Sequence, residues 1–288
     1  MPLLLCQIHG TVVGKMVRKK HPHVTAYMKS ISKRIQKRPS ILVGTSGFFY
    51  DHWGDGTFYP KNLSKRKWLE YYTEHFDTVE LNVAFYRLPT EKAFKSWYKR
   101  TPKDFAFALK GSKFITHIKR LKDCQDPLKL YFDRAKLLRE KLTVILWQLP
   151  PRYKKNIERL KTFIKYLRPY GKCRHAFEFR DESWFSKGVY ELLREEDMAL
   201  CEADYPGMPQ NIPATASFVY LRRHGPKAEN AIYSGCYSKE YLKKDSRRIK
   251  NWHKRGKSIY VYFNNDIEGW AIKNSLELKG MLGGEGKT

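Results

Sequence analysis

Eight short apolar runs recur along the chain, and most of them end in a polar or charged residue. The runs occupy residues 41–46, 78–82, 105–110, 143–148, 175–180, 199–204, 217–224 and 258–264. Parallel strands buried on both faces read as continuous apolar runs, so each run predicts a strand. Helical patterns separate most of them, at residues 63–76, 90–100, 127–140, 156–167, 187–197, 238–255 and 270–281. This alternation predicts an α/β fold, a single TIM-like (β/α)8 barrel with its active-site mouth at the carboxyl ends of the strands.

The stretch between residues 204 and 217 is too short for a full helix. Pro206, Gly207, Pro209 and Pro213 interrupt it, and such residues favour turns. The sequence therefore predicts a degenerate sixth βα unit. We expect the barrel to cover residues 41–282, followed by a flexible tail at 283–288.

Side chains two residues apart share one face of a strand. In the third run the large side chains of Phe105 and Phe107 fall on one face, and Ala106, Ala108 and Lys110 fall on the other. The large residues suit packing against helices, so the second face is expected to point into the barrel. Applied to every run, the rule predicts a polar mouth formed by Glu80, Asn82, Lys110, Gln148, Glu178, Arg180, Asp204, Arg222, His224 and Asn264.

Two interpretations of this mouth stand side by side. One is a ligand site, because a barrel that needed only stability could close with apolar layers. The other is a mutually satisfied ion network, with Glu178 paired to Arg180 and Asp204 to Arg222, since buried charges need partners. Lys110 would then be an ion-pair partner of Glu80 or Glu178.

Charge separates the amino-terminal segment from the remainder. The chain of 288 residues has 56 Lys and Arg against 29 Asp and Glu, a formal charge of +27. Residues 1–40 hold nine of these cations and no Asp or Glu. This basic extension reads as a disordered arm that contacts phosphates, as an organelle- or nucleus-directed segment, or as sequence upstream of a mis-assigned start. The barrel is basic without it, which favours polyanions such as nucleic acid as partners.

The five cysteines and the hydropathy pattern predict a cytoplasmic protein. No two cysteines form a C-x-x-C pair, which argues against zinc-knuckle and thioredoxin-type motifs and fits reduced thiols. Cys201 lies inside a predicted strand and is expected to fill the core. No apolar run approaches the ~18 residues that span a bilayer, so no membrane partner is expected.

A set of motifs occurs in a fixed order along the chain. They are VGTSGFFYDHW at 43–53, FYP at 58–60, TVELNVAFYRLP at 78–89, TP at 101–102, FAFALK at 105–110, TH at 116–117, ILWQLPP at 145–151, AFEFRDESW at 176–184, FVYLRRHG at 218–225 and YVYFNN at 260–265. Over about 41–282 the chain resembles the YecE-like family, known as domain of unknown function 72. The resemblance implies a TIM-like barrel and no established reaction. The basic extension and the Val83-Ala84-Phe85 step depart from the family pattern.

The motif residues coincide with the inward-facing strand ends and give the candidate site. The candidate catalytic residues are Glu80, Lys110, His117, Glu178, Asp204 and His224. The candidate ligand-binding residues are Ser46, Asn82, Tyr86, Gln148, Arg180, Trp184, Arg222, Tyr262, Asn264 and Asn265. His117 follows the third strand in a loop expected to overhang the mouth, which makes it a candidate acid or base.

The leading hypothesis is a metal-assisted hydrolase for phosphoesters, with nucleic acid as the expected substrate. Glu80, Glu178, Asp204 and His224 would supply ligands for Mg or Mn. Lys110, Arg180 and Arg222 would hold phosphate oxygens, and aromatic residues near the mouth, Tyr86 and Trp184 among them, would stack on bases.

Two alternatives use the same residues. One is a metal-free enzyme for a small anionic metabolite such as a sugar phosphate, in which Lys110 forms a Schiff base or transfers a proton and Glu178 or His224 is the general base. The other is a module that binds a phosphorylated ligand or RNA without turnover. The sequence leaves the substrate and the oligomeric state open.

Overall fold

The computed structural model describes residues 40–226 and 231–283. Its strands are β1 Ile41–Thr45, β2 Thr78–Leu81, β3 Ala106–Lys110, β4 Leu142–Gln148, β5 Arg174–Glu178, β6 Ala199–Leu200, β7 Glu202–Ala203, β8 Phe218–Arg223 and β9 Ser258–Phe263. Its α-helices are α2 Trp68–His75, α3 Val83–Tyr86, α4 Glu91–Lys99, α5 Gln125–Ala135, α6 Ile157–Leu167, α7 Lys187–Glu195, α8 Lys239–Lys254 and α9 Trp270–Gly283. Short helical turns are η1 Asp51–Trp53, η2 Lys65–Lys67, the π-helical η3 Phe114–Ile118, η4 Lys136–Lys141, η5 Arg168–Tyr170, η6 Glu182–Trp184 and η7 Ile267–Gly269.

The predicted basic extension and the carboxyl-terminal tail fall almost entirely outside these residues, which begin at Ser40 and end at Gly283. Within them the predicted strands and helices are present, with ends shifted by a few residues. Side-chain caps start several helices: Thr90 accepts a hydrogen bond from Ala93 N, and Asn156 accepts one from Arg159 N.

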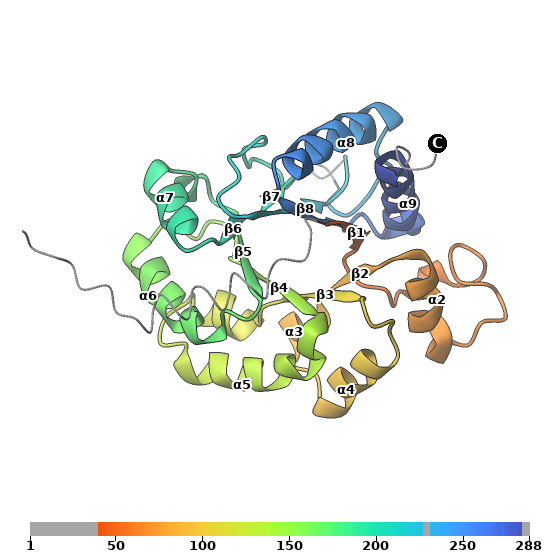
Figure 1. The fold of residues 1–288 in the computed structure, drawn as a ribbon, viewed down its shortest axis with the longest axis horizontal. Coiled ribbons are helices and arrows are strands. Elements are labelled where there is room, and N and C mark those ends of the chain that lie inside the picture. The colour runs from red at the N-terminus through yellow and green to blue at the C-terminus, as the bar shows by residue number, and fades with distance from the viewer. Residues whose placement is uncertain (1–39, 227–230, 284–288) are drawn as a thin grey trace, which may run out of the picture. The chain divides into compact units, whose positions relative to one another are not determined.

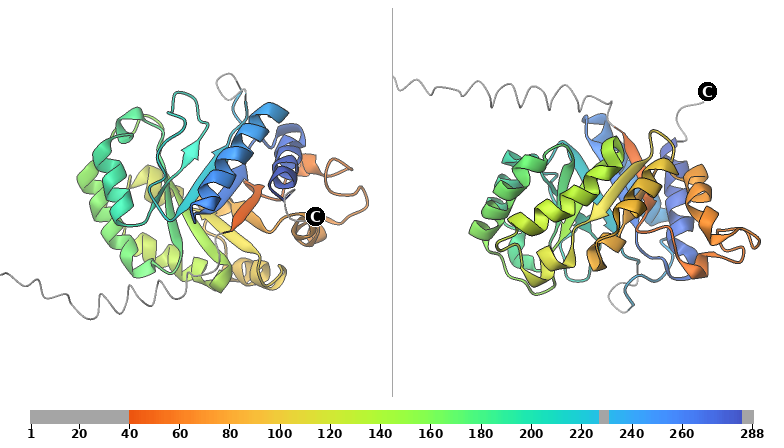
Figure 2. Two further views of the ribbon diagram at one scale, coloured as in Figure 1. Left: turned by 45° about the horizontal axis from the view of Figure 1, so that its top comes forward. Right: turned by 90° about the horizontal axis from the view of Figure 1, so that it is seen from below.

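All strand pairs are parallel, and helices lie outside the strands (Figures 1 and 2). The strands form two sheets, ordered β1-β9-β8-β7 and β2-β3-β4-β5-β6. The α/β class is thereby confirmed, and the arrangement is consistent with a TIM-like barrel. The sequence predicts a single ring of eight strands, whereas the observed strand pairing gives two separate sheets.

The two sheets meet at two places. Between β1 and β2 the pairing is reduced to one parallel bridge, from Ser46 to Glu80. At the other junction the sixth predicted strand is split at Cys201 into β6 and β7, which pair with different sheets. The segment after β7 contains turns and no helix until β8, as its proline content suggests.

The core has two layers that follow the predicted alternation. Phe107, Leu109 and Phe177 belong to the larger cluster, which packs against the helices. The smaller cluster holds the alternate residues, including Ala108 and Ala176. Cys201 is in this inner cluster, as expected from the sequence.

Gly44 allows the close approach of β1 to β2. A Cβ atom at this position would lie 2.3 Å from the carbonyl oxygen of Thr78, which is backbone and cannot rotate away. We expect Gly44→Ala to lower the free energy of unfolding by about 1–3 kcal/mol, because overpacking forces a backbone shift. Urea denaturation measures the change.

Gly188 is the matched control, since a Cβ atom there would meet nothing within 4 Å. It lies in α7, where alanine is the better helix former, so Gly188→Ala should leave stability unchanged or raise it by up to about 1 kcal/mol. Equal effects of the two substitutions would contradict the close contact at β1.

Candidate active site

The center of the site is Arg222, a buried arginine near the end of β8. Its Nη2 and Nε donate to Glu80 of β2, at 2.8 Å to Oε1 and 3.1 Å to Oε2. Its Nη1 donates to Oε2 of Glu178, the last residue of β5, at 2.7 Å. Both carboxylates are fully buried, so one guanidinium compensates two charges that would otherwise be costly.

Further donors complete both carboxylates. Oε1 of Glu80 accepts from Ser46 Oγ at 2.7 Å, and Oε2 accepts from the Tyr220 hydroxyl at 2.6 Å. Glu178 Oε1 accepts from Arg180 Nε at 2.7 Å. Burial alone would raise the pKa of Glu178, but Arg180 and Arg222 outweigh it and hold that pKa well below its usual range. Glu178 is therefore an ionised acceptor, and every oxygen of both carboxylates accepts from at least one donor.

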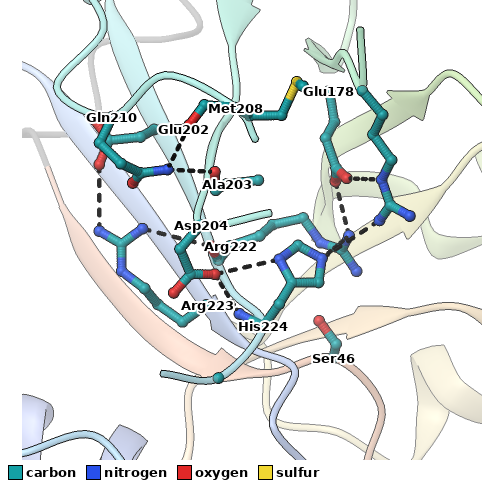
Figure 3. A network of polar contacts seen from close by, with 12 residues as sticks. Ser46, Glu178, Glu202, Ala203, Asp204, Met208, Gln210, Arg222, Arg223 and His224 are labelled. Carbon is teal, nitrogen blue, oxygen red and sulfur yellow. Dashed lines mark hydrogen bonds and ion pairs between the residues drawn. The ribbon is translucent and has the colours of Figure 1, made fainter. Parts of the chain in front are cut away.

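His224 lies between Arg222 and Asp204 (Figure 3). Its Nε2 is 3.1 Å from Arg222 Nη1 and 3.4 Å from Arg180 Nη2. Guanidinium nitrogens only donate, so Nε2 accepts and the proton of the neutral ring is on Nδ1, 3.4 Å from Asp204 Oδ1. Burial lowers the pKa of His224, which keeps the imidazole neutral.

Asp204, which directly follows β7, does not pair with Arg222. Its Oδ1 accepts from the backbone N–H of His224 at 2.5 Å, and its Oδ2 accepts from the Tyr237 hydroxyl. The predicted pairing of Glu178 with Arg180 is confirmed, and the predicted pairing of Asp204 with Arg222 is wrong. Arg222 reaches across to β2 and β5 instead, because its side chain points inward.

Lys110 ends β3 and is buried, with 8% of its surface exposed. Among the described residues no carboxylate oxygen lies within 4.0 Å of its Nζ, so the predicted ion pair with Glu80 or Glu178 is wrong. The ammonium position is instead 4.0 Å from the centroid of the Phe85 ring. Burial and then Arg222 lower the pKa of Lys110 to about 7. Close to neutral pH this amine is therefore a mixture of charged and neutral forms.

His117 in η3 lies beside this amine. Thr116 Oγ1 donates to the Ser112 carbonyl at 3.0 Å, so at 2.9 Å it must accept from His117 Nδ1–H. The proton of the neutral imidazole is then on Nδ1, and Nε2 keeps its lone pair. Burial, followed by the charge of Lys110, lowers the pKa of His117 to about 4.

Four other predicted ligand-binding residues differ in their exposure to solvent. Gln148 and Asn264 are buried at strand ends, and Asn82 precedes α3 with a buried Oδ1 that has no partner among the described residues. Tyr86 is 76% exposed and points into solvent.

Three further candidates take part in the packing below or beside the mouth. The indole of Trp184 is buried, stacks on Phe179 at 4.4 Å and donates to a backbone carbonyl, so it has no free face for a base. The Tyr262 hydroxyl is buried against Thr78 at 2.7 Å. The amide of Asn265 donates to Gly235 and Asn274.

Sequence reasoning left out three tyrosines that hold the site. Tyr220 bonds to Glu80, Tyr237 bonds to Asp204, and the Tyr205 ring lies 4.1 Å from the Arg180 guanidinium carbon. Alternation in the run 217–224 places Tyr220 on the face of Arg222 and was the available signal. Tyr237 follows a loop whose path no periodicity defines.

The four predicted metal ligands do not gather around a common center. Arginine and hydroxyl donors occupy the oxygens of Glu80 and Glu178, while Asp204 lies on the far side of His224. Within the described part of the chain, no three His, Cys, Asp or Glu side chains form a group suited to a metal ion. The same residues include no helix long and apolar enough to cross a membrane.

Comparisons with known proteins identify relatives of this chain. Residues 42–288 match the family described as "Protein of unknown function DUF72". The chain is 27% identical to the UPF0759 protein YunF of Bacillus subtilis, over 84% of this chain and 94% of that protein. It is 30% identical to the UPF0759 protein YecE of Escherichia coli over 43% and 45% of the two chains.

Solved structures agree with the fold. A DUF72 family protein from Thermotoga maritima is similar with a TM-score of 0.75 and 31% identity, over 84% of this chain and 99% of that one. A DUF72 family protein from Enterococcus faecalis has a TM-score of 0.69 at 19% identity, over 85% and 98%.

Replacing Arg222 tests the central pairing. We expect Arg222→Met to lower the free energy of unfolding by about 3–5 kcal/mol, because two buried carboxylates lose their shared partner. Urea denaturation at pH 7 measures the loss. As a control, Lys161→Met removes a solvent-exposed pair with Glu158 and should cost at most about 1 kcal/mol. Similar losses in both variants would contradict the buried network.

Replacing Lys110 tests its protonation. Between about pH 7 and 10.5 the unfolded chain keeps this lysine charged while the folded protein releases its proton. Since the unfolded state then binds more protons, the stability of the wild type relative to Lys110→Met rises with pH across this window. We expect the variant to be the more stable protein at pH 6 and the difference to shrink by pH 9.

Urea denaturation of both proteins at pH 6, 7, 8 and 9 measures this trend, with Lys161→Met measured alongside as a replacement of a solvent-exposed lysine. A pH-independent offset for Lys110→Met would mean that Lys110 keeps an ordinary pKa.

Proposed function

Since this chain belongs to the DUF72 family, whose description assigns no reaction, we propose its function from its own site: a metal-independent enzyme that acts through the Lys110 amine on a small anionic metabolite with a carbonyl group. The observation that carries the proposal is Lys110 itself. It is a buried amine at the carboxyl end of β3, with a pKa near 7 and no carboxylate partner within 4.0 Å among the described residues.

The chemistry needs a neutral amine. Nζ of neutral Lys110 attacks the carbonyl carbon, a proton passes from nitrogen to oxygen, and loss of water leaves an imine, which takes up one proton from solvent to become the iminium. His117 can accept such a proton at Nε2. Its Nδ1–H donates to Thr116, which leaves the lone pair of Nε2 free. Glu178 is a poor base, because both of its oxygens accept from arginines.

The anionic group would bind at Arg180. Its Nε and Nη2 are directed to Glu178 and His224, while its Nη1 has no hydrogen-bond partner within the described part of the chain. Stacking on Tyr205 fixes the plane of this guanidinium, which favours a phosphate or carboxylate in a defined orientation.

The geometry favours this reading over the metal-assisted hydrolase. A divalent metal needs carboxylate oxygens, and here arginines and hydroxyl groups hold them. We further propose that the two sheets act as one closed (β/α)8 barrel, which the bridge from Ser46 to Glu80 supports. A nucleic-acid partner and a cytoplasmic location stay predictions from composition.

Reductive methylation tests the Lys110 amine directly. The protein is treated with 13C-formaldehyde and cyanoborohydride at pH 7, and peptide mapping locates the label. An ordinary lysine is neutral for less than about 0.1% of the time at pH 7, whereas an amine with a pKa near 7 is neutral for about half. We therefore expect Lys110 to be modified ahead of exposed lysines such as Lys161, and its dimethylamine resonance to titrate near pH 7.

Glyceraldehyde 3-phosphate with cyanoborohydride then tests the anion subsite. Arg180→Gln keeps a donor for Glu178 but removes a charge that helps to lower the pKa of Lys110. We therefore expect it to reduce phosphate-aldehyde trapping at Lys110 by a larger factor than it reduces formaldehyde labelling. Titration of Lys110 above about pH 9, or labelling no faster than at Lys161, would refute the proposed function.

A further inference from the structure

Two short helical turns beside the mouth expose large apolar side chains. Val83 and Tyr86 of α3 are 45% and 76% exposed, and Phe114 and Ile118 of η3 are 51% and 65% exposed. Each pair is three or four residues apart and so lies on one side of its turn. These four make up half of the exposed large hydrophobic residues in the described part of the chain. We call them the α3–η3 face.

The two turns that carry the α3–η3 face also contact the Lys110 site. Phe85 of α3 is buried, with its ring centroid 5.0 Å from that of His117 in η3 and 4.0 Å from Lys110 Nζ. Because α3 directly follows β2 and η3 follows β3, both turns stand at the carboxyl ends of adjacent strands. The two turns therefore meet through Phe85 and His117 where the amine is located.

From this juxtaposition we infer that the substrate carries an apolar portion, an acyl chain or an aromatic ring, that lies across the α3–η3 face while its carbonyl group reaches Lys110. The inference rests on the proposed function and names the substrate class: an amphipathic carbonyl compound with an anionic group. An apolar chain in this position would also cover the amine and exclude water, which keeps it in its neutral form.

Charge around the face fits the same class. Lys113 and Arg87 are exposed next to the apolar residues, and Lys119 Nζ is 5.8 Å from the centroid of the Phe114 ring. A rim that is apolar and cationic matches a ligand that is apolar and anionic.

Chain-length dependence of reductive trapping tests the inference. The wild type is treated with butanal or octanal and cyanoborohydride at pH 7, and peptide mapping gives the yield at Lys110 and, for general partitioning, at exposed Lys161. Each fully buried methylene favours binding roughly fourfold. For four methylenes that are partly buried, we expect the octanal-to-butanal ratio at Lys110 to exceed that at Lys161 by about tenfold or more.

Surface variants identify the face. Tyr86→Ser and Ile118→Ser should bring the ratio at Lys110 close to that at Lys161 while formaldehyde labelling stays as in the wild type. Leu130→Ser is the matched control, since Leu130 is 55% exposed on α5, outside this face, and it should keep the wild-type ratio.

The outcomes separate the two proposals. Formaldehyde labelling of Lys110 without a chain-length preference, or with one that the two variants leave intact, overturns the inference alone. The inference is also overturned if light scattering shows that Tyr86→Ser changes the oligomeric state while the octanal-to-butanal ratio at Lys110 is unchanged. The α3–η3 face would then be an interface between copies of the chain. Absent formaldehyde labelling at Lys110 overturns the proposed function and the inference with it.

Discussion

The guanidinium of Arg222 connects the two sheets through the interior. Arg222 belongs to the four-stranded sheet, whereas Glu80 and Glu178 belong to the five-stranded sheet. Backbone pairing between the sheets is sparse, so these buried hydrogen bonds, with those from Ser46 and Tyr220 to Glu80, hold the strand ends in register. Every contact is charge-assisted or buried, which makes the arrangement rigid and costly to break.

This rigidity decides which groups are free to react. Because Glu80 and Glu178 neutralise Arg222 and Arg180, no carboxylate is left for Lys110. The lysine therefore has cations as neighbours and an aromatic ring beneath it, and both its burial and the arginine charges favour loss of its proton. A network that looks structural thus creates the chemical property of the site.

Much of this could be predicted from the sequence, for a specific reason. A buried parallel strand has one rule, alternation, and it placed Lys110, Glu178 and Arg222 on the inner face at the correct end. The ion-pair partner of a charged side chain follows no such rule, because it depends on which strands lie within reach across the interior. Asp204 follows β7 and Arg222 lies on the neighbouring β8. The Arg222 side chain nevertheless points inward and binds Glu80 of β2 and Glu178 of β5.

The role of an aromatic residue near the mouth is also difficult to predict from the sequence. Trp184 and Tyr262 stand in motifs next to charged residues, but a large ring after a strand is as useful for packing as for binding. Only the structure shows that Trp184 stacks on Phe179, whereas Tyr86, in the same kind of motif, faces solvent. Exposure, rather than residue type, separates an aromatic group available to a ligand from one the fold already uses.

The charge balance of the site also constrains how a ligand would bind. Glu80, Glu178, Arg180 and Arg222 sum to zero, so an added anion would favour the protonated form of Lys110 and suppress attack by the amine. An anion held by Nη1 of Arg180 limits this effect, because it contacts a guanidinium beside Tyr205 instead of the Lys110 amine. The apolar Phe85 ring beneath Lys110 likewise cannot hold an anion there. Separation of the anion subsite from the amine is thus a condition for nucleophilic chemistry, and the fixed plane of Arg180 is the feature that meets it.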